Sequence, residues 1–490
     1  MTNYQQSFKQ IVMNKININF LYYSVLIFIT ILFRLYNINY DDFWIDEIIS
    51  FYISDPSITL NEFYHRHKTL ENSPFLFNFI LRNYFEIFGY NTSIARYLPS
   101  ILNSLSIFFL IYFYKKILNG KLSLVLFILL AFNIYLIKYS QELRLYSWYL
   151  FIFVINIYYF YKVINSENIK SHLNFFLFFL TSIFLVITHP FALIIVFSYT
   201  AFLIYKNFSK KVFEMKLFKL LILINCFSAI FIIFFILNTT HQPIWIENID
   251  WKFFTNFFFS KFFGSRLIGG IYLLILAYLI VKYLKNILFE KNFEMFLLIT
   301  IFFSYSIPIV YSYIFNPAVV DRYLIYLVLI IVLLMTILID KIESKQLRLF
   351  ICGILIISTI GNLFTETTFK QFFKERTVHK PDLKSVLLEI KKSSNFNVTL
   401  NLEKTYLSKS EISNAFENYL KNYSKIDDLK IEFFNYLVID KEKYSKRIWI
   451  ICLNDLNGDD CEIPTIFTKF KTIKESSFNS VNVKLIEKVI

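Results

Sequence analysis

Long runs of apolar residues alternate with short polar stretches along most of the chain. The runs measure roughly 17 to 25 residues, and a helix of about 20 apolar residues crosses the hydrocarbon core of a bilayer. The pattern therefore predicts an α-helical polytopic membrane protein with about eleven spans. We expect the spans at residues 19–36, 98–114, 122–138, 145–161, 174–188, 190–206, 217–237, 265–284, 294–314, 321–339 and 347–364.

Composition supports a membrane location. Hydrophobic residues make up 56% of the 490 positions, with 60 Phe and 34 Tyr, which is too apolar and aromatic for an ordinary soluble protein. Residues 365–490 hold 21 basic and 18 acidic side chains, so most of the net charge of +14 lies in the apolar part. Positive charge beside membrane helices sets their orientation, and we expect no nucleic-acid partner.

Lysine is distributed unevenly among the predicted loops. With a cytoplasmic N-terminus, which Lys9 and Lys15 favour, five lysine-rich loops fall on the inner side, as the positive-inside rule requires. These loops carry Lys115, Lys116 and Lys121; Lys162 and Lys170; Lys206, Lys210, Lys211 and Lys216; Lys282, Lys285 and Lys291; and Lys341, Lys345 and Arg348. An odd number of spans then places the C-terminal segment outside.

The first outer loop, residues 37–96, is far longer than an ordinary connection, which is typical of functional loops. It holds the adjacent carboxylates of Asp46 and Glu47 within the apolar stretch Phe43–Ser50. Partial burial among aromatic side chains would raise a carboxylate pKa and make it a useful base near neutral pH. The alternative is a solvated acidic turn. Further along, the aromatic segment Pro74–Phe88 fits a helix in the membrane interface.

Three other polar clusters fall on the same outer face. They are Tyr139–Tyr146, which contains Glu142 and Arg144, then Thr188-His189-Pro190, and Asp321-Arg322-Tyr323. Arginines also gather on this face, against the charge bias: Arg34, Arg66, Arg82, Arg96, Arg144, Arg266 and Arg322. A guanidinium group suits phosphate oxygens, so the cluster indicates a bound anion, whereas any single arginine could be an interfacial anchor or an ion-pair partner.

The last part of the chain loses the long apolar runs. Residues 366–490 read as a small α/β domain, with helices near 383–392 and 410–423 and strands at 397–402, 431–438 and 447–453. On the outer face, oxidation could join Cys452 to Cys461, although two free thiols are an alternative.

The order of these motifs resembles the protein O-mannosyltransferase and aminoarabinose-transferase superfamily, which is glycosyltransferase family 39 with its relatives. The resemblance covers residues 15–365, within the proposed membrane domain 1–365. It rests on six segments: Trp44-Ile45-Asp46-Glu47, Asn72-Ser73-Pro74-Phe75-Leu76, Gly89 through Arg96 with Ser100, Tyr139–Tyr146, Thr188-His189-Pro190 and Asp321-Arg322-Tyr323. Many relatives have a histidine and two prolines where this chain has Asn72-Ser73-Pro74.

This resemblance implies the membrane-embedded C-type glycosyltransferase fold and transfer, with inversion, of a hexosyl or pentosyl group. The donor would be a sugar on a polyprenyl phosphate, and the acceptor a hydroxyl of a protein, lipid or glycan, at the outer face of a bacterial plasma membrane. Asp46 would be the general base, with Glu47 supporting it or contacting a divalent cation. Arg144, Arg322 and Arg96 would bind the donor phosphate. Supporting residues would be Glu142, Tyr146 and His189.

Two other functions compete with this one. A transporter or flippase for lipid-linked saccharides would also need outer arginines, but transporters usually place ionisable groups on broken helices near the bilayer midplane. With only 8 Gly, the chain favours unbroken helices. The other alternative is a non-catalytic subunit of an envelope-assembly machine. No cofactor is implied with certainty, and a divalent metal is left open.

Overall fold

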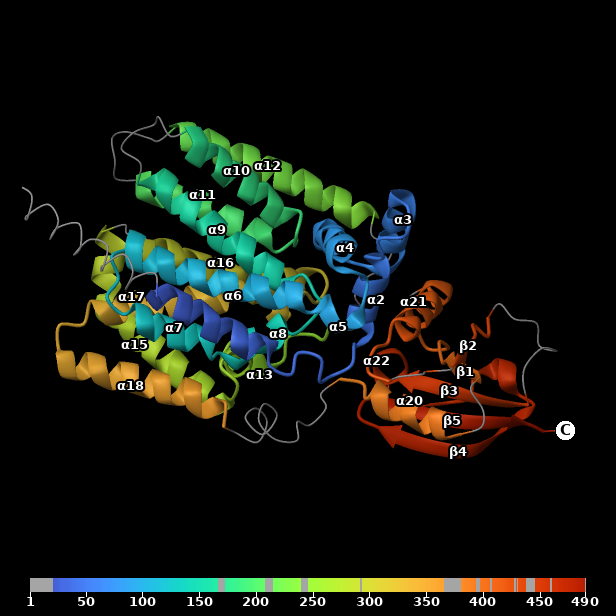
Figure 1. Cartoon of the computed structure of the whole chain (residues 1–490). Helices are drawn as coiled ribbons and strands as arrows, with labels where there is room; N and C mark the ends of the chain where they lie inside the picture. Colours follow the sequence, from blue (N-terminus) through green and yellow to red (C-terminus); the bar gives the residue numbers. More distant parts are fainter. Residues whose placement is uncertain are drawn as a thin grey trace, which may run out of the picture.

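The computed structural model describes residues 21–165, 172–207, 215–238, 246–290, 293–364, 380–393, 397–405, 408–426, 429, 431–437, 446–458 and 461–489. Within them, a bundle of long helices is followed by a C-terminal domain built on one sheet (Figure 1). The first outer loop folds into short helices at the end of the bundle that faces this domain (Figure 1).

Each apolar stretch predicted to span the membrane holds a helix. In chain order these are Leu21–Leu35, α6 (Tyr97–Tyr112), α7 (Ser123–Ala131) with α8 (Ile134–Ser140), α9 (Tyr146–Ile164), α10 (His172–Val186), α11 (Ala192–Asn207), α12 (Met215–Asn238), α15 (Arg266–Glu290), α16 (Phe293–Ile314), α17 (Tyr326–Asp340) and α18 (Lys345–Asn362). The helical class of the bundle is therefore confirmed.

The number of membrane crossings is not confirmed. Among the described residues, five helices are both long and apolar enough to cross a bilayer, and the pair α7 and α8, bent by 58°, would be a sixth. Four other apolar helices are shorter. One of them, α17, is buried on all sides at the centre of the bundle, as its uniformly apolar sequence requires. Eleven spans therefore stay a prediction.

The break between α7 and α8 differs from the expectation of unbroken helices. It falls at Phe132–Asn133 and needs no glycine, because the side chain of Asn133 replaces the lost backbone contacts. Its carbonyl oxygen accepts from the amide of Leu136, and its amide donates to the carbonyl of Phe262. An asparagine at the N-cap of a helix can thus stabilise a bend.

The loops predicted on the inner side meet at one end of the bundle. Lys121, Lys206 and Lys341 line a single cavity of about 430 Å³ together with Glu294 and Asp340. Lys341 pairs with Glu294 at 2.8 Å, so part of this positive charge is balanced locally. The shared position agrees with the common sidedness that the lysine pattern predicts; Lys170, Lys210, Lys211 and Lys291 lie outside the described residues.

The first outer loop contains four helices: α2 (Ile45–Ile53), α3 (Leu60–Leu70), α4 (Leu76–Phe88) and α5 (Thr92–Ala95). The predicted helix over Pro74–Phe88 is present as α4. Its apolar face packs against α2, where the rings of Phe51 and Phe85 lie 5.4 Å apart in an edge-to-face contact. Burial of such aromatic side chains stabilises the loop as a compact unit.

The C-terminal domain has the predicted mixed α/β structure. Its strands are β1 (Asn397–Leu400), β2 (Glu432–Phe433), β3 (Arg447–Leu453), β4 (Phe470–Phe478) and β5 (Val481–Lys488), in the order β2-β1-β3-β5-β4. The β1–β2 and β1–β3 pairs are parallel and the other two are antiparallel. Its helices include α20 (Leu383–Lys392), α21 (Lys409–Lys421) and α22 (Asn454–Asn457). The predicted strand 431–438 is reduced to β2, and residue 438 lies outside the described residues.

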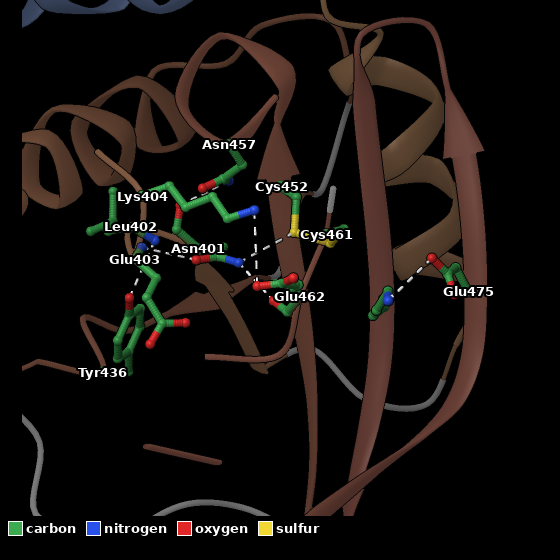
Figure 2. The surroundings of a disulfide bond; sticks show 11 residues. Asn401, Leu402, Glu403, Lys404, Tyr436, Cys452, Asn457, Cys461, Glu462 and Glu475 are labelled. Atoms are coloured by element: carbon green, nitrogen blue, oxygen red, sulfur yellow. Dashed lines mark hydrogen bonds and ion pairs between the residues drawn. A yellow bond between two sulfur atoms is a disulfide. The ribbon is translucent and has the colours of Figure 1, made fainter. Parts of the chain in front are cut away.

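Of the two alternatives for the last cysteines, the structure has the disulfide. Cys452 at the end of β3 is bonded to Cys461, with the Cα atoms 5.5 Å apart (Figure 2). Beside it, the amide of Asn401 donates to the carbonyl of Glu462 at 2.8 Å, which ties the segment after the disulfide to the end of β1. The disulfide therefore lies at the end of β3, the central strand of the sheet, next to α22.

Candidate active site

Asp46 and Glu47 lie in the first turn of α2, where the free backbone N–H groups of the helix favour negative charge. Successive residues of a helix point about 100° apart, so the two carboxylates leave the helix in different directions. The Glu47 side chain is fully buried, whereas 28% of the Asp46 side chain is exposed. The adjacent carboxylates thus have different environments and different chemistry.

Glu47 is held by four hydrogen-bond donors. Arg96 donates to both carboxylate oxygens at 2.8 and 2.7 Å, Lys380 donates at 2.6 Å, and the amide of Leu143 donates at 2.7 Å. Burial alone would raise the pKa of Glu47, but Arg96 and Lys380 outweigh it and lower the pKa to about 2. For Glu47 the expected rise in pKa is therefore wrong, and this carboxylate is a structural anion at neutral pH.

Arg96 has no N–H group left for a phosphate. Beyond its two bonds to Glu47, the guanidinium donates to three backbone carbonyls at 2.8 to 3.1 Å, those of Ile38, Asp41 and Asp42. An arginine has five N–H donors, and all five are used. This geometry argues against the predicted phosphate contact, and Arg96 instead ties the start of the first outer loop to α6.

Arg144 is the cation beside Asp46. Its guanidinium lies 3.9 Å from the Asp46 carboxylate and pairs with both oxygens of Glu71, at 2.6 and 3.2 Å. It also donates to the hydroxyl of Ser50 at 3.0 Å. Among the described residues, its Nε has no acceptor although it is buried. Arg144 is thus fixed in place with one donor unused.

Arg322, in the 3-10 turn η2 (Asp321–Leu324), lies close enough to Asp46 for their charges to interact. Its guanidinium lies 5.5 Å from the ring centre of Trp44, the residue before α2. Burial would lower the pKa of Arg322, but the nearby Tyr146 phenol and the charge of Asp46 outweigh it and raise the pKa above its usual value. The structure therefore brings Asp46, Arg144 and Arg322 together.

The predicted supporting residues also lie in this region. His189 is buried against the ring of Tyr149 and lies 5.0 Å from the ring of Tyr323. Burial and the charges of Arg144 and Arg322 lower the pKa of His189 to about 3, so the imidazole is neutral. Its Nδ1 accepts from the amide of Phe191 at 3.1 Å.

Two further predicted residues have different environments. Tyr146 is buried, packs edge-to-face with Tyr139 and adjoins Arg322. Glu142 is 4% exposed, with one oxygen 4.0 Å from the ammonium of Lys380. Its other oxygen has no hydrogen-bond partner among the described residues. Glu142 therefore adjoins the structural cluster around Glu47.

No metal site is apparent in the described residues, where no group of three His, Cys, Asp or Glu side chains could hold an ion. His65 is exposed on α3 while His67 is buried, because residues two apart on a helix do not share a face. His67 faces Glu71 instead, and burial lowers its pKa.

Sequence reasoning missed three residues of this region: Glu71, Lys380 and Asp455. Glu71 directly precedes the Asn72-Ser73-Pro74 motif, and this position could have identified it as a candidate site residue. Lys380 and Asp455 belong to the C-terminal domain, and no sequence pattern around them indicates that they lie near α2. Asp455 lies close enough to Asp46 for their charges to interact.

Comparison with known proteins gives no identification, because no protein-family model and no curated protein matches the chain.

Proposed function

We propose that this protein is an inverting glycosyltransferase that moves a hexosyl or pentosyl group from a polyprenyl-phosphate donor to an acceptor hydroxyl. The observation that carries the proposal is the partly exposed Asp46 carboxylate, which lies 3.9 Å from Arg144 and whose charge also acts on Arg322. A base for the acceptor and cations for a phosphate leaving group are the two requirements of such a transfer.

In the proposed reaction, the acceptor oxygen attacks the anomeric carbon from the face opposite the phosphate. The bond from that carbon to the phosphate oxygen breaks, and its electron pair leaves with the lipid phosphate. Asp46 takes the proton of the acceptor hydroxyl. One displacement inverts the configuration, and no covalent enzyme intermediate forms.

The two arginines have different parts in this proposal. Glu71 fixes Arg144, which therefore holds Asp46 in position and offers its unused Nε to the leaving group. Arg322 lines a cavity of about 530 Å³ together with Lys252, Lys261 and Arg266. The same cavity is lined by Glu247, Asp250 and Asp321, and Lys261 lies 3.6 Å from Asp321, so its charge is mixed. We assign the donor phosphate to the part of the cavity lined by Arg322, because a guanidinium group suits phosphate oxygens and the volume accommodates a sugar.

The proposed location follows from sidedness. The site lies at the end of the bundle opposite the lysine-rich cavity, which the positive-inside rule assigns to the cytoplasm. The disulfide supports an extracytoplasmic C-terminal domain, since disulfides persist in oxidising compartments. We therefore propose an integral protein of a bacterial plasma membrane, with a cytoplasmic N-terminus and the reaction at the outer face.

A transporter or flippase is the second candidate, and the bend between α7 and α8 favours it. However, Asn133 already satisfies the backbone at this bend, and the ionic cluster lies in loops rather than at the break. The enzyme therefore accounts for more of the charged residues. The third candidate, a non-catalytic assembly subunit, does not explain why a partly exposed Asp46 carboxylate lies beside Arg144.

The test replaces Asp46 by Asn and measures glycan transfer in membranes supplied with polyprenyl-phosphate sugar. Loss of a general base lowers the rate by about 10² to 10⁴. The matched control is Glu86→Gln, which neutralises an exposed carboxylate on α4 in the same loop. The proposal is wrong if Asp46→Asn transfers sugar at the wild-type rate at an equal protein level.

A further inference from the structure

The C-terminal domain contacts the stretch of the first outer loop that carries Asp46. Before α2, the phenol of Tyr419 accepts from the amide of Phe43 at 3.3 Å, and the two rings stack with centres 5.3 Å apart. Near the end of α2, the phenol of Tyr52 donates to Glu411 at 3.2 Å. Tyr419 and Glu411 belong to α21, which lies beside α2 (Figure 1). The domain therefore holds the chain both before and after Asp46.

Between these contacts, the ammonium of Lys380 reaches carboxylates on two different segments. It lies 2.6 Å from Glu47, the residue after Asp46, and 4.0 Å from Glu142, two residues before Arg144. Both carboxylates are buried, so solvent screens these interactions only weakly. One cation of the C-terminal domain thus joins the segment that carries Asp46 to the segment that carries Arg144.

The backbone of Lys380 is itself fixed to the sheet of the domain. Its carbonyl accepts from the side-chain amide of Asn479 at 2.9 Å, and the carbonyl of Asn479 accepts from the backbone amide of Asp382 at 3.0 Å. Asn479 lies in the turn between β4 and β5, and Asp382 is the N-cap of α20. These bonds set the point from which the ammonium reaches α2.

Glu47 keeps a counter-charge without Lys380. Arg96 donates to both of its carboxylate oxygens, and the amide of Leu143 donates to one of them. The bidentate pair with Arg96 is the stronger arrangement for a carboxylate. Neutralising Glu47 therefore does not account for a second buried cation supplied by another domain.

Docking of the domain does not account for Lys380 either. Lys425 already pairs with the buried carboxylate of Asp42 at 2.7 Å, and the phenol of Tyr423 donates to the same carboxylate at 2.7 Å. Among the described residues, Lys425 forms this ion pair and none with Glu47 or Glu142. What distinguishes Lys380 is its place between the two segments of the candidate site.

We propose that Lys380 is a positioning residue for the transfer reaction: its ammonium holds Glu47 and Glu142 together and thereby keeps the Asp46 carboxylate beside Arg144. A catalytic group must be held within about 0.5 Å of its productive position, and a misplacement of about 1 Å can lower the rate by about 10². This inference rests on the proposed transferase function. It makes the docked C-terminal domain a requirement for transfer.

The test compares Lys380→Met with Lys425→Met in the full-length protein. Each change removes one ammonium between the C-terminal domain and the first outer loop, but Lys425→Met keeps the link between Glu47 and Glu142. We expect Lys380→Met to lower kcat per folded protein about 10-fold, with both KM values changed less than about 3-fold. Lys425→Met should keep kcat within about 3-fold of the wild type. Lys380→Arg retains the charge and should recover most of the activity.

Amide hydrogen exchange adds a measurement that needs no substrate. Lys380→Met should speed exchange in both α2 and the segment Tyr139–Tyr146, because the contact that joins them is lost, whereas Lys425→Met should leave both at wild-type rates. If Lys380→Met does not fold, Lys380→Gln replaces it, since an amide still donates to Glu47 without a charge.

Three results would each overturn the role of Lys380: wild-type kcat without its ammonium, an equal loss of kcat in Lys425→Met, or unchanged exchange in the two segments. Failure of the proposed function gives a different result. If the wild type transfers no sugar while exchange responds as expected, the transferase function is wrong and Lys380 still positions α2.

Discussion

Two ionic clusters meet at adjacent residues of α2. The closed cluster contains Glu47, Arg96 and Lys380, and every oxygen and guanidinium N–H in its central pair has a protein partner. The open cluster contains Asp46, Arg144, Glu71 and Arg322, and keeps a partly exposed carboxylate. A charged side chain whose hydrogen-bonding positions are all used by the protein serves structure, whereas one with positions left over is available for chemistry. The number of partners, more than the residue type, distinguishes the two clusters.

The largest effect should follow from opening the closed cluster. Glu47→Gln leaves Arg96 and Lys380 buried without their anion, which should cost about 3–5 kcal/mol of stability. Thermal unfolding in detergent measures this loss. The control is Glu62→Gln, because 43% of the Glu62 side chain is exposed and its loss leaves Arg66 in contact with Tyr52, so the expected cost is about 1 kcal/mol or less. Equal stability of both variants would contradict the assignment of Glu47 to structure.

The next effect concerns the open cluster. Arg322→Met should lower kcat/KM for the polyprenyl-phosphate donor by about 10² to 10³, because a cation at the leaving phosphate is lost. Arg322→Lys should recover only part of the activity, since an ammonium group lacks the planar fork of donors. Donor kinetics with protein of verified thermal stability measure both variants. Wild-type kinetics for Arg322→Met would remove Arg322 from the site.

A smaller effect is expected at Glu71. Glu71→Gln weakens the fixation of Arg144, which keeps Asp46 as a counter-charge at 3.9 Å and Ser50 as an acceptor. We expect activity to fall by about 10-fold through misplacement of the guanidinium, with a smaller loss of stability than in Glu47→Gln. Parallel transfer and unfolding measurements decide the order. A larger loss of stability than in Glu47→Gln would reverse the comparison between the clusters.

The smallest effect is a pH dependence of stability. The pKa of Glu47 falls from 4.5 to about 2 in the folded chain, so its charged form favours the folded state at pH above about 4.5. This contribution is lost progressively as the pH falls towards 2. The unfolding midpoint of the wild type should therefore decrease over this range, and Glu47→Gln should show a weaker decrease. Parallel curves for the two proteins would place the acid-sensitive group elsewhere.

The hydrophobic pattern was sufficient to predict the helices of the bundle, because long apolar runs have one dominant solution in a membrane. It did not decide how many cross, since α17 is apolar but short and entirely enclosed. The strand β4 gave no apolar alternation, because most of its side chains are exposed and polar. That strand forms through its pairing with β5, a tertiary effect.

The candidate site was predictable only in part. Asp46, Arg144 and Arg322 each lie in a polar cluster between predicted spans, so the sequence pointed to all three. Their partners did not follow from spacing, because Glu71 lies 73 residues from Arg144 and Lys380 lies 333 residues from Glu47. The different roles of Asp46 and Glu47 depend on the direction in which each leaves α2, which requires the packing of Arg96 and the C-terminal domain.

The central claim is that Asp46 takes the acceptor proton, and the single-turnover transfer rate of Asp46→Asn at saturating donor and acceptor tests it most directly. We predict a rate at least about 10² lower than that of the wild type, with an unchanged unfolding midpoint. A wild-type single-turnover rate would contradict the claim and leave Asp46 without a catalytic role.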